Sequence, residues 1–415
     1  MLVKCMSQVS VLVVFLVAAA GFALAQDNWL GGTGNWSDGA LWSTGVPLPA
    51  NNVLINSGGP DSVTLDVSTT INSLTLGGDN FTSELTDGGA AQTLSITRAL
   101  NVGGSGYLNL YGGTAVAAGA ASSNEGRIDL ENASALTVAG NFTNSLLLTA
   151  LNGGGGNTVT ITGMLTNNGT FYLLGAGDMA TIGNGLSNGG TLDVADGTLR
   201  ITGDGNNTFN GGLSTGGTLT ITGDLMNQGG FNVAGSGASA SMRTLTNYLS
   251  AGVSVDSGAT LDAMRVDNYN LISVFGGTMV VGTGTPRGPG YYQFANGTLG
   301  EFVTAFEFSQ IRVDSGVVNL NGTLDIIVPS GGEPGVGSTF QFLLFNPGSL
   351  SGTFASIQND IFAGGTEKWV VIYNDSGGYV GLMAEKNLTP EPSSLLLLGS
   401  GVLAGIGALR RKLTR

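Results

Sequence analysis

Aspartates supply the side chains in this sequence whose spacing could support chemistry. Asp193 lies three residues before Asp196, and Asp256, Asp262 and Asp267 fall within one short stretch. Two carboxylates at a fixed separation can hydrolyse a glycosidic bond, and several together can bind calcium. Aspartate is also a preferred turn residue, because its side chain accepts hydrogen bonds from nearby backbone amides. We therefore expect turn residues here, with no catalytic residue and no cofactor, while weak calcium binding at Asp and Asn corners stays open.

The residue types on which most catalytic mechanisms depend are missing or scattered. The chain has no histidine, and its single cysteine is Cys5. A polysaccharide lyase would need an arginine or lysine base, yet no lysine lies between Lys4 and Lys368. The arginines of this region are single and widely spaced: Arg98, Arg127, Arg200, Arg243, Arg265, Arg287 and Arg312. We expect the protein not to be an enzyme, because the usual general acid-base group and a paired base are both absent.

The chain is acidic but carries few charges. It has 14 basic and 28 acidic residues and a formal net charge of −14. Charged residues make up 10% of the chain, against roughly 25% in ordinary soluble domains. An acidic surface repels nucleic acid, so we expect no nucleic-acid partner. The 71 glycines follow no Gly-X-Y register, which excludes collagen, and the many Val, Ile, Leu and Thr residues argue against disorder.

The body of the chain repeats itself. One family of strings starts 40 and then 20 residues apart: TVTITG (158–163), TLRITG (198–203) and TLTITG (218–223). A second family joins a leucine and a polar pair to an alternating strand: LTNNGTFYL (165–173), LSNGGTLDV (186–194), LSTGGTLTI (213–221) and the degenerate LMNQGGFNV (225–233). Later copies at 277–281 and 297–299 again differ by 20 residues. Alternating apolar and polar residues between Gly, Asn or Asp are typical of a strand with one buried face.

A strand of this kind cannot bury its face alone, so a period near 20 residues predicts that neighbouring copies stack. The simplest stack is all-β: a single-stranded right-handed parallel β-helix, or solenoid, with turns about 4.8 Å apart. We expect roughly a dozen turns over residues 61–325. A β-sandwich array or a β-propeller is the alternative, although a propeller blade needs four strands and 40 or more residues.

Both ends of such a solenoid need a cap, because an open end exposes the core and unpaired backbone. Residues 26–60 contain Trp29, Trp36 and Trp42, which we expect to form the N-terminal cap. A platform on which sugar rings stack is the alternative role for these rings. Residues 326–385 are more aromatic and less periodic, and we expect a C-terminal cap of antiparallel strands. The tryptophan-rich opening and the SLTLG strand (73–77) resemble the start of autotransporter-passenger β-helices.

Asn-x-Ser/Thr sequences recur along the repeats, for example at Asn80, Asn141 and Asn168. They arise by chance in a repeat that is rich in Asn and Thr, so we infer no glycosylation from them. We expect instead that asparagines stack and hydrogen-bond from one turn to the next.

Residues 1–25 have the order of a secretory signal peptide. Lys4 is followed by an apolar core at 9–20, and the small residues Ala23 and Ala25 form a cleavage site before Gln26. The removed segment contains Cys5, so the exported chain would have no disulfide and no thiol.

Residues 386–415 have three parts in order. Pro390, Glu391 and Pro392 come first, an apolar run follows at 395–409, and Arg410 and Arg411 stand near the end. The stretch 393–409 reaches the lower length limit for a helix that crosses a bilayer, and the arginines favour the cytoplasmic face. We therefore expect one C-terminal transmembrane helix. A plain membrane anchor is one interpretation of this tail.

The same tail resembles the PEP-CTERM sorting signal of Gram-negative bacteria. The resemblance implies that an exosortase processes the chain and delivers it to the cell surface or extracellular matrix, with the two prolines, Glu391 and the two arginines as the signal residues. We expect an exported protein with a structural or adhesive role that contacts the membrane before processing, with extracellular polysaccharide as an open partner. The alternative is a polysaccharide lyase, a hydrolase or a carbohydrate-binding module on the same scaffold.

Overall fold

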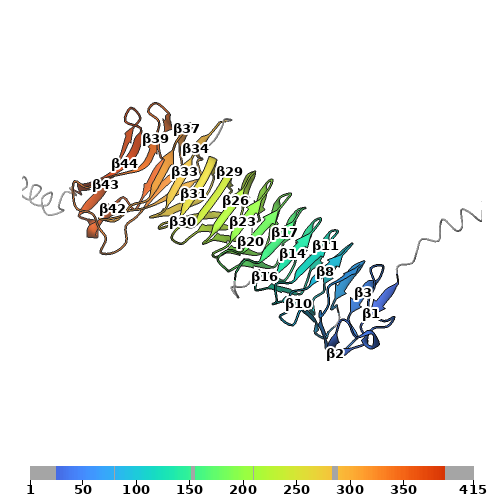
Figure 1. Ribbon diagram of the computed structural model, residues 1–415. Coiled ribbons are helices and arrows are strands. Elements are labelled where there is room, and N and C mark those ends of the chain that lie inside the picture. The colour runs from blue at the N-terminus through green and yellow to red at the C-terminus, as the bar shows by residue number, and fades with distance from the viewer. Residues whose placement is uncertain (1–24, 79, 151–154, 209, 283–287, 388–415) are drawn as a thin grey trace, which may run out of the picture.

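The computed structural model describes residues 25–387, apart from residues 79, 151–154, 209 and 283–287. The described chain winds into an elongated parallel β-solenoid of about 13 turns (Figure 1). This confirms the predicted all-β solenoid. The predicted transmembrane helix falls outside the described residues, and within them no helix has the length and apolar character needed to cross a membrane.

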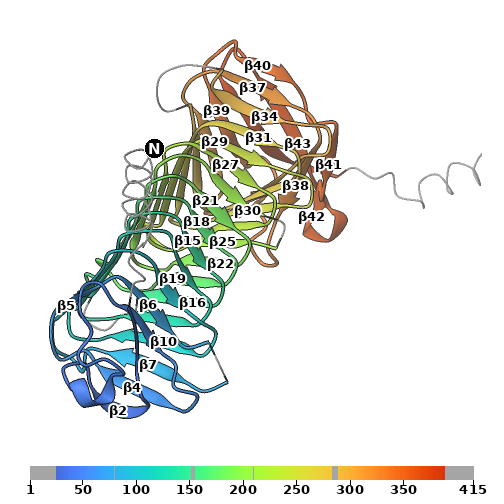
Figure 2. The same ribbon diagram turned by 90° about the vertical axis from the view of Figure 1, so that its right-hand side faces the viewer.

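From β5 onward each turn of the solenoid contributes to three faces, here called A, B and C, while the first two turns contribute only to faces B and C. Figure 2 shows strands of faces B and C as two rows that follow the long axis. Face A contains β5 (Thr69–Ile71), β8 (Thr93–Ile96), β11 (Ala115–Ala118), β14 (Ala135–Val138), β17 (Thr158–Ile161), β20 (Met179–Ile182), β23 (Thr198–Ile201), β26 (Thr218–Ile221), the first parts of β29 (Ser239–Asn247) and β31 (Thr260–Asn268), β33 (Thr278–Val281), β36 (Gln310–Val313) and β39 (Thr339–Phe345).

The second row follows face A along the chain. Face B contains β1 (Gln26–Asn28), β3 (Asn52–Ile55), β6 (Ser73–Leu76), β9 (Leu100–Val102), β12 (Ser122–Asn124), β15 (Phe142–Asn144), β18 (Leu165–Asn167), β21 (Leu186–Asn188), β24 (Gly205–Asn207), β27 (Asp224–Asn227), the second parts of β29 and β31, β34 (Gly290–Gln293), β37 (Val317–Leu320) and β40 (Leu350–Gly352). Because β29 and β31 each run through a corner, faces A and B form one 29-stranded sheet.

The third row is a separate 15-stranded sheet. Face C contains β2 (Gly32–Asn35), β4 (Asp61–Thr64), β7 (Ser83–Thr86), β10 (Gly106–Leu110), β13 (Arg127–Leu130), β16 (Leu147–Ala150), β19 (Thr170–Leu173), β22 (Thr191–Val194), β25 (Gly212–Thr215), β28 (Gly230–Val233), β30 (Gly252–Asp256), β32 (Leu271–Phe275), β35 (Thr298–Phe302), β38 (Thr323–Ile327) and β41 (Ser356–Gln358). Its neighbours all pair in parallel.

The core follows from the alternation in each strand. In β17 the side chains of Val159 and Ile161 are buried, while Thr158 and Thr160 lie on the outer surface. The same positions in the next turn's strand, β20, hold Ala180 and Ile182, which are also buried. Inward side chains of all three faces meet in one continuous apolar cluster along the solenoid. Stacking thus buries the face that a single strand would leave exposed.

The repeat strings map onto this geometry with one correction. TVTITG, TLRITG and TLTITG all form face-A strands, as their common spacing predicts. LTNNGTFYL and LSNGGTLDV both turn from face B into face C, but LSTGGTLTI turns from face C into face A. The copies at 277–281 and 297–299 likewise belong to different faces, A and C. The corner between faces B and C and the corner between faces C and A share one sequence pattern. Alignment by sequence similarity therefore placed together strands that do not stack on one another.

Glycine is required where successive corners approach one another closely. A Cβ on Gly190, in the turn before β22, would overlap the backbone carbonyl oxygen of Gly169 one turn earlier. By contrast, a Cβ on Gly230, the first residue of β28, would meet nothing within 4 Å. Corner glycines such as Gly190 therefore permit close stacking, whereas Gly230 on face C leaves open space outside the sheet.

Asparagines form a hydrogen-bonded ladder inside the corner between faces B and C. Each side-chain amide except the last donates to the Asn oxygen of the next turn at 2.7–3.1 Å, and every member is fully buried. The ladder contains Asn124, Asn144, Asn167, Asn188, Asn207, Asn227, Asn247 and Asn268. Each amide also donates to a backbone carbonyl at the start of the next face-C strand, for example Asn188 to Gly212 at 3.0 Å. The ladder therefore satisfies polar groups that the corner would otherwise bury without partners.

The ladder confirms that asparagines stack from turn to turn, but it does not use the asparagines of the sequons. The side chains of Asn80, Asn141 and Asn168 are exposed. Asn168 directly follows the ladder member Asn167, so the two neighbours have opposite environments. The sequons are therefore not explained by the stacking.

The N-terminal tryptophans lie in the core at the beginning of the solenoid. Trp29, Trp36 and Trp42 are 2%, 0% and 3% exposed, and the Trp42 ring centroid lies 4.9 Å from that of Trp29 and 5.0 Å from that of Trp36. The short helix η1 (Gly39–Leu41) joins them. None of the three rings presents a free face, so they cannot serve as a platform for sugar rings in this conformation. Parallel stacking already begins here, since β1 pairs with β3 and β2 pairs with β4.

The C-terminal end combines parallel and antiparallel pairing. Parallel stacking runs past residue 325, because β39, β40 and β41 each pair with a strand of the preceding turn. The antiparallel part consists of β42 (Ile361–Phe362), β43 (Glu367–Asn374) and β44 (Tyr379–Lys386), and β44 also pairs with β39. The helix η2 (Ala363–Gly365) connects β42 to β43. These strands cover the last turn of face A.

Candidate functional site

The aspartates that the sequence offered for chemistry are spread over different faces. Asp256 ends β30 on face C, Asp262 lies on the face-A part of β31, and Asp267 lies on its face-B part. The carboxylate of Asp267 is already engaged, because it accepts a hydrogen bond from Arg265 Nε at 2.8 Å. Three carboxylates on three faces of a solenoid cannot act on one bond.

The other pair is also divided. Asp193 lies on the outer surface of β22 and accepts from Ser214 Oγ at 2.7 Å, whereas Asp196 is exposed in the turn that follows. Among residues 25–387, outside the gaps named above, no group of three or more His, Cys, Asp and Glu could hold a metal ion. The described residues therefore bring none of the predicted carboxylate sets together.

Several carboxyl groups that the sequence did not single out are buried, among them Glu301 and Asp129. Glu301 in β35 is 0% exposed, and neither carboxyl oxygen has a hydrogen-bond partner. Burial raises its pKa well above the ordinary value, because desolvation penalises the charged form. Asp129 in β13 is 1% exposed and contacts Arg127. Its pKa is also raised by burial, against the opposing effect of the arginine. The two groups lie in different parts of the solenoid and form no common site.

Face C carries a shallow groove of about 500 Å³ over five successive strands, β22, β25, β28, β30 and β32. Gly212, Gly230 and Gly252 follow one another in register along its floor. A Cβ on any of these glycines would meet nothing within 4 Å, so the floor is open because side chains are missing there. The residues that line the groove include no charged side chain. We call this feature the face-C groove.

A row of polar side chains runs beside the glycine floor. Ser214, Asn232, Ser254 and Ser273 occupy equivalent positions in consecutive turns. Ser254 Oγ donates to the side-chain oxygen of Asn232, which links two turns. One hydroxyl or amide per turn, at a spacing of about 4.8 Å, suits an extended ligand that lies along the solenoid. A neutral ligand fits best, because the groove offers no charge to pair with.

An aromatic stack, which the sequence analysis missed, stands at the corner next to this groove. Tyr248, Tyr269 and Phe294 lie on three consecutive turns, with ring centroids 6.2 and 3.9 Å apart and nearly parallel planes. Tyr248 is 39% exposed, and the turn that it begins leads into Gly252 on the groove floor. A sequence signal does exist, because each ring directly follows a buried amide residue, Asn or Gln, at the end of a face-B strand.

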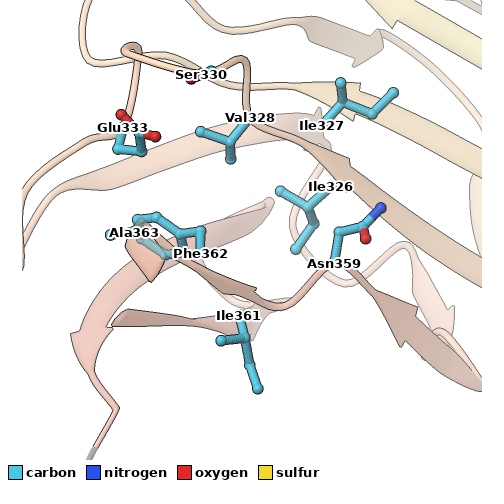
Figure 3. Close-up of a pocket in the computed structure, with 9 residues that line it drawn as sticks. All are labelled: Ile326, Ile327, Val328, Ser330, Glu333, Asn359, Ile361, Phe362 and Ala363. Atoms are coloured by element: carbon cyan, nitrogen blue, oxygen red, sulfur yellow. The ribbon is translucent and has the colours of Figure 1, made fainter. Parts of the chain in front are cut away.

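A second cavity lies at the C-terminal end (Figure 3). It has a volume of about 450 Å³ and is bounded by the end of β38, the segment 328–333 and the β42–η2 connection. Ile326, Val328 and Phe362 supply apolar walls, and Glu333 is the one acidic side chain of the lining. One carboxylate among apolar groups makes no hydrolytic pair.

The sequence-predicted sorting and cleavage residues lie mostly outside the described residues. This holds for Ala23, Pro390, Glu391, Pro392, Arg410 and Arg411. Ala25 is exposed, and its carbonyl accepts from the backbone amide of Asn52 at 2.8 Å. Gln26, the predicted first residue of the exported chain, begins β1.

Comparisons with known proteins identify the tail. Residues 388–412 match the family model of the PEP-CTERM protein-sorting motif. No curated protein matches the chain. A similar solved structure is described as the crystal structure of a TibC-catalyzed hyper-glycosylated TibA fragment, with 15% sequence identity and a TM-score of 0.24; the match covers 72% of this chain and 100% of that one. The motif implies exosortase-dependent export toward the cell surface or the extracellular space. The chain therefore carries a PEP-CTERM sorting signal behind a parallel β-solenoid.

Proposed function

We propose that this protein is a rod of the bacterial cell surface or extracellular matrix with a structural or adhesive role. The observation that carries the proposal is a sorting motif at 388–412 behind a solenoid with one continuous core and one continuous asparagine ladder. Such a body derives its stiffness from stacked strands and needs neither a disulfide nor a cofactor. Its long faces can make many weak contacts at once, as multivalent matrix proteins do.

The tail has a defined part in this proposal. The apolar run 395–409 holds the chain in the membrane, with the rod outside, until an exosortase cuts near Pro390 and Pro392. Before that step the signal peptide at 1–25 has directed export across the inner membrane.

A structural role predicts that polysaccharides survive contact with the protein. Residues 26–389 incubated with a panel of acidic and neutral polysaccharides are expected to release no reducing ends and no unsaturated products. The physical reason is the separation of the aspartates over three faces. Product release from any polysaccharide in the panel would contradict the proposal and favour the lyase or hydrolase alternative.

A second candidate function, neutral-polysaccharide binding, is favoured by the face-C groove and its row of hydroxyl and amide groups. The substitution Gly230→Leu places a side chain on the groove floor without a clash, because a Cβ there meets nothing within 4 Å. We expect about tenfold weaker retention on an immobilised neutral polysaccharide, or about 1.4 kcal/mol. The matched control is Gly335→Leu, an exposed glycine with equally open space. Equal retention of both variants would remove the groove from consideration.

A further inference from the structure

The C-terminal end of the rod exposes large apolar side chains. Phe306 is 98% exposed at the tip of a hairpin closed by the bridge between Val303 and Phe308. Ile361, in β42, is 54% exposed, and Phe308 is 37% exposed. We call these three residues, Phe306, Phe308 and Ile361, the apolar end. Exposed apolar side chains gathered at one place usually mark a surface that another phase or molecule covers.

One member of the apolar end, Phe308, belongs to a packed aromatic cluster that reaches β42. Phe308 lies 5.6 Å from Phe340, measured between ring centroids, and Phe340 lies 5.9 Å from Trp369. Trp369 stacks on Phe362 at 4.5 Å, and Phe362 is the chain neighbour of Ile361. The cluster thus connects the hairpin that carries Phe306 with β42, the strand that carries Ile361.

The hairpin that presents Phe306 is held in place by hydrogen bonds. The amide of Thr304 donates to the Glu307 carbonyl at 2.7 Å, and the amide of Ala305 donates to the Gly332 carbonyl at 3.0 Å. The Glu307 carboxylate accepts from Ser257 Oγ at 2.9 Å, so it turns back toward the body while Phe306 faces out. The hairpin backbone that carries Phe306 is therefore held in place at this end.

The chain leaves the body beside the apolar end. Asn387 donates from its backbone amide to the Thr366 carbonyl at 2.8 Å and from its side chain to the Gly365 carbonyl at 2.9 Å, next to η2. Only residues 388–394 separate this point from the apolar run at 395–409. Seven residues span at most about 25 Å when fully extended. Whatever surface holds the apolar run thus lies within that distance of Asn387.

We propose that, while the tail is attached, this end of the folded rod rests on the lipid bilayer, with Phe306 and Ile361 inserted at the level of the headgroups. The inference depends on the proposed function, in which 395–409 is the membrane segment. Apolar and aromatic side chains are favoured at this depth. The surface is not basic, because Lys368 lies 4.0 Å from Glu385 and Glu333 stands nearby. Apolar burial rather than charge holds the contact, so it is insensitive to salt.

The test uses the full chain with Cys5→Ser and a single introduced cysteine, since the sequence has no other. Phe306→Cys, Ile361→Cys and the control Leu48→Cys are labelled with an environment-sensitive fluorophore and reconstituted in phosphatidylcholine vesicles that contain nitroxide-labelled lipid. Leu48 is 64% exposed and precedes β3, at the other end of the rod. We expect at least threefold stronger quenching at 306 and 361 than at 48, unchanged between low and high salt.

The outcomes separate the two proposals. Failure of the full chain to float with the vesicles contradicts the membrane role of the tail itself. Flotation with equal quenching at 306 and 48 overturns the inference about the apolar end and leaves the tail's role intact. A probe at 306 that is shielded from iodide in water but not quenched by the lipid would show that a second copy of the protein covers the apolar end. That result would also overturn the inferred contact with the bilayer.

Discussion

Replacing one asparagine in the middle of the ladder is expected to destabilise the solenoid by about 3–5 kcal/mol. Asn188→Leu keeps the side-chain size but removes both donated bonds, to Asn207 at 2.9 Å and to the Gly212 carbonyl at 3.0 Å. It also removes the acceptor of Asn167, at 2.8 Å. The partners stay buried and unsatisfied, and each such group costs about 1–3 kcal/mol. Denaturant unfolding of residues 26–387, followed by circular dichroism, measures the loss.

The matched control for this prediction is Asn168→Leu. Asn168 is exposed and directly follows Asn167, the ladder residue one turn before Asn188, so the substitution changes the same type of side chain in the neighbouring turn without burial. We expect a change within about 0.5 kcal/mol. Equal unfolding midpoints for the two variants would show that the ladder contributes nothing to stability.

The second large effect is a gain in stability at Glu301. The side chain is fully buried, its oxygens lack partners, and its neighbours in register on face C are Val274 and Ile326. Glu301→Leu replaces a polar group by an apolar one in apolar surroundings, and we expect about 2–4 kcal/mol of stabilisation at pH 8. Denaturant unfolding at pH 8 checks the gain.

The stabilisation by Glu301→Leu is expected to increase with pH. Burial raises the pKa of Glu301 above that of the unfolded chain, so the unfolded state releases the proton first as the pH rises. The group therefore lowers the free energy of unfolding progressively above about pH 4.3, the ordinary glutamate pKa. The stabilisation by Glu301→Leu should grow from pH 4 to pH 8. The control is Glu125→Leu, because Glu125 is exposed. If the stabilisation by Glu301→Leu did not change with pH, the claim that Glu301 is buried with a raised pKa would be contradicted.

Much of the architecture could be predicted from the sequence, because strand alternation and a 20-residue spacing are local signals. TVTITG, TLRITG and TLTITG indicated stacked strands, and they do stack on face A. Which strands stack on one another was harder to predict, because two corners share the same pattern of a leucine, a polar pair and Gly-Thr. LSTGGTLTI was therefore aligned with strands that lie on another face.

The remaining features depend on contacts between turns, which a single sequence does not reveal. Asn167 and Asn168 look alike in the sequence, yet one is buried in the ladder and the other is exposed. Glu301 follows Gly300 in a strand that comes after the turn-like pair Asn296 and Gly297, and nothing local marks its side chain as inward-facing. The face-C groove arises because three glycines coincide in register, although they are separated by 18 and 22 positions in the sequence.

Locating the protein in cells tests most directly the central claim that a folded rod is carried to the surface by its tail. The full chain and a chain without residues 390–415 are expressed with the same epitope inserted after Gln26. We expect intact cells to be labelled at the surface, or the epitope to be found in the extracellular matrix, only for the full chain, while the truncated chain stays soluble in the periplasm. The same distribution for both chains would contradict the account.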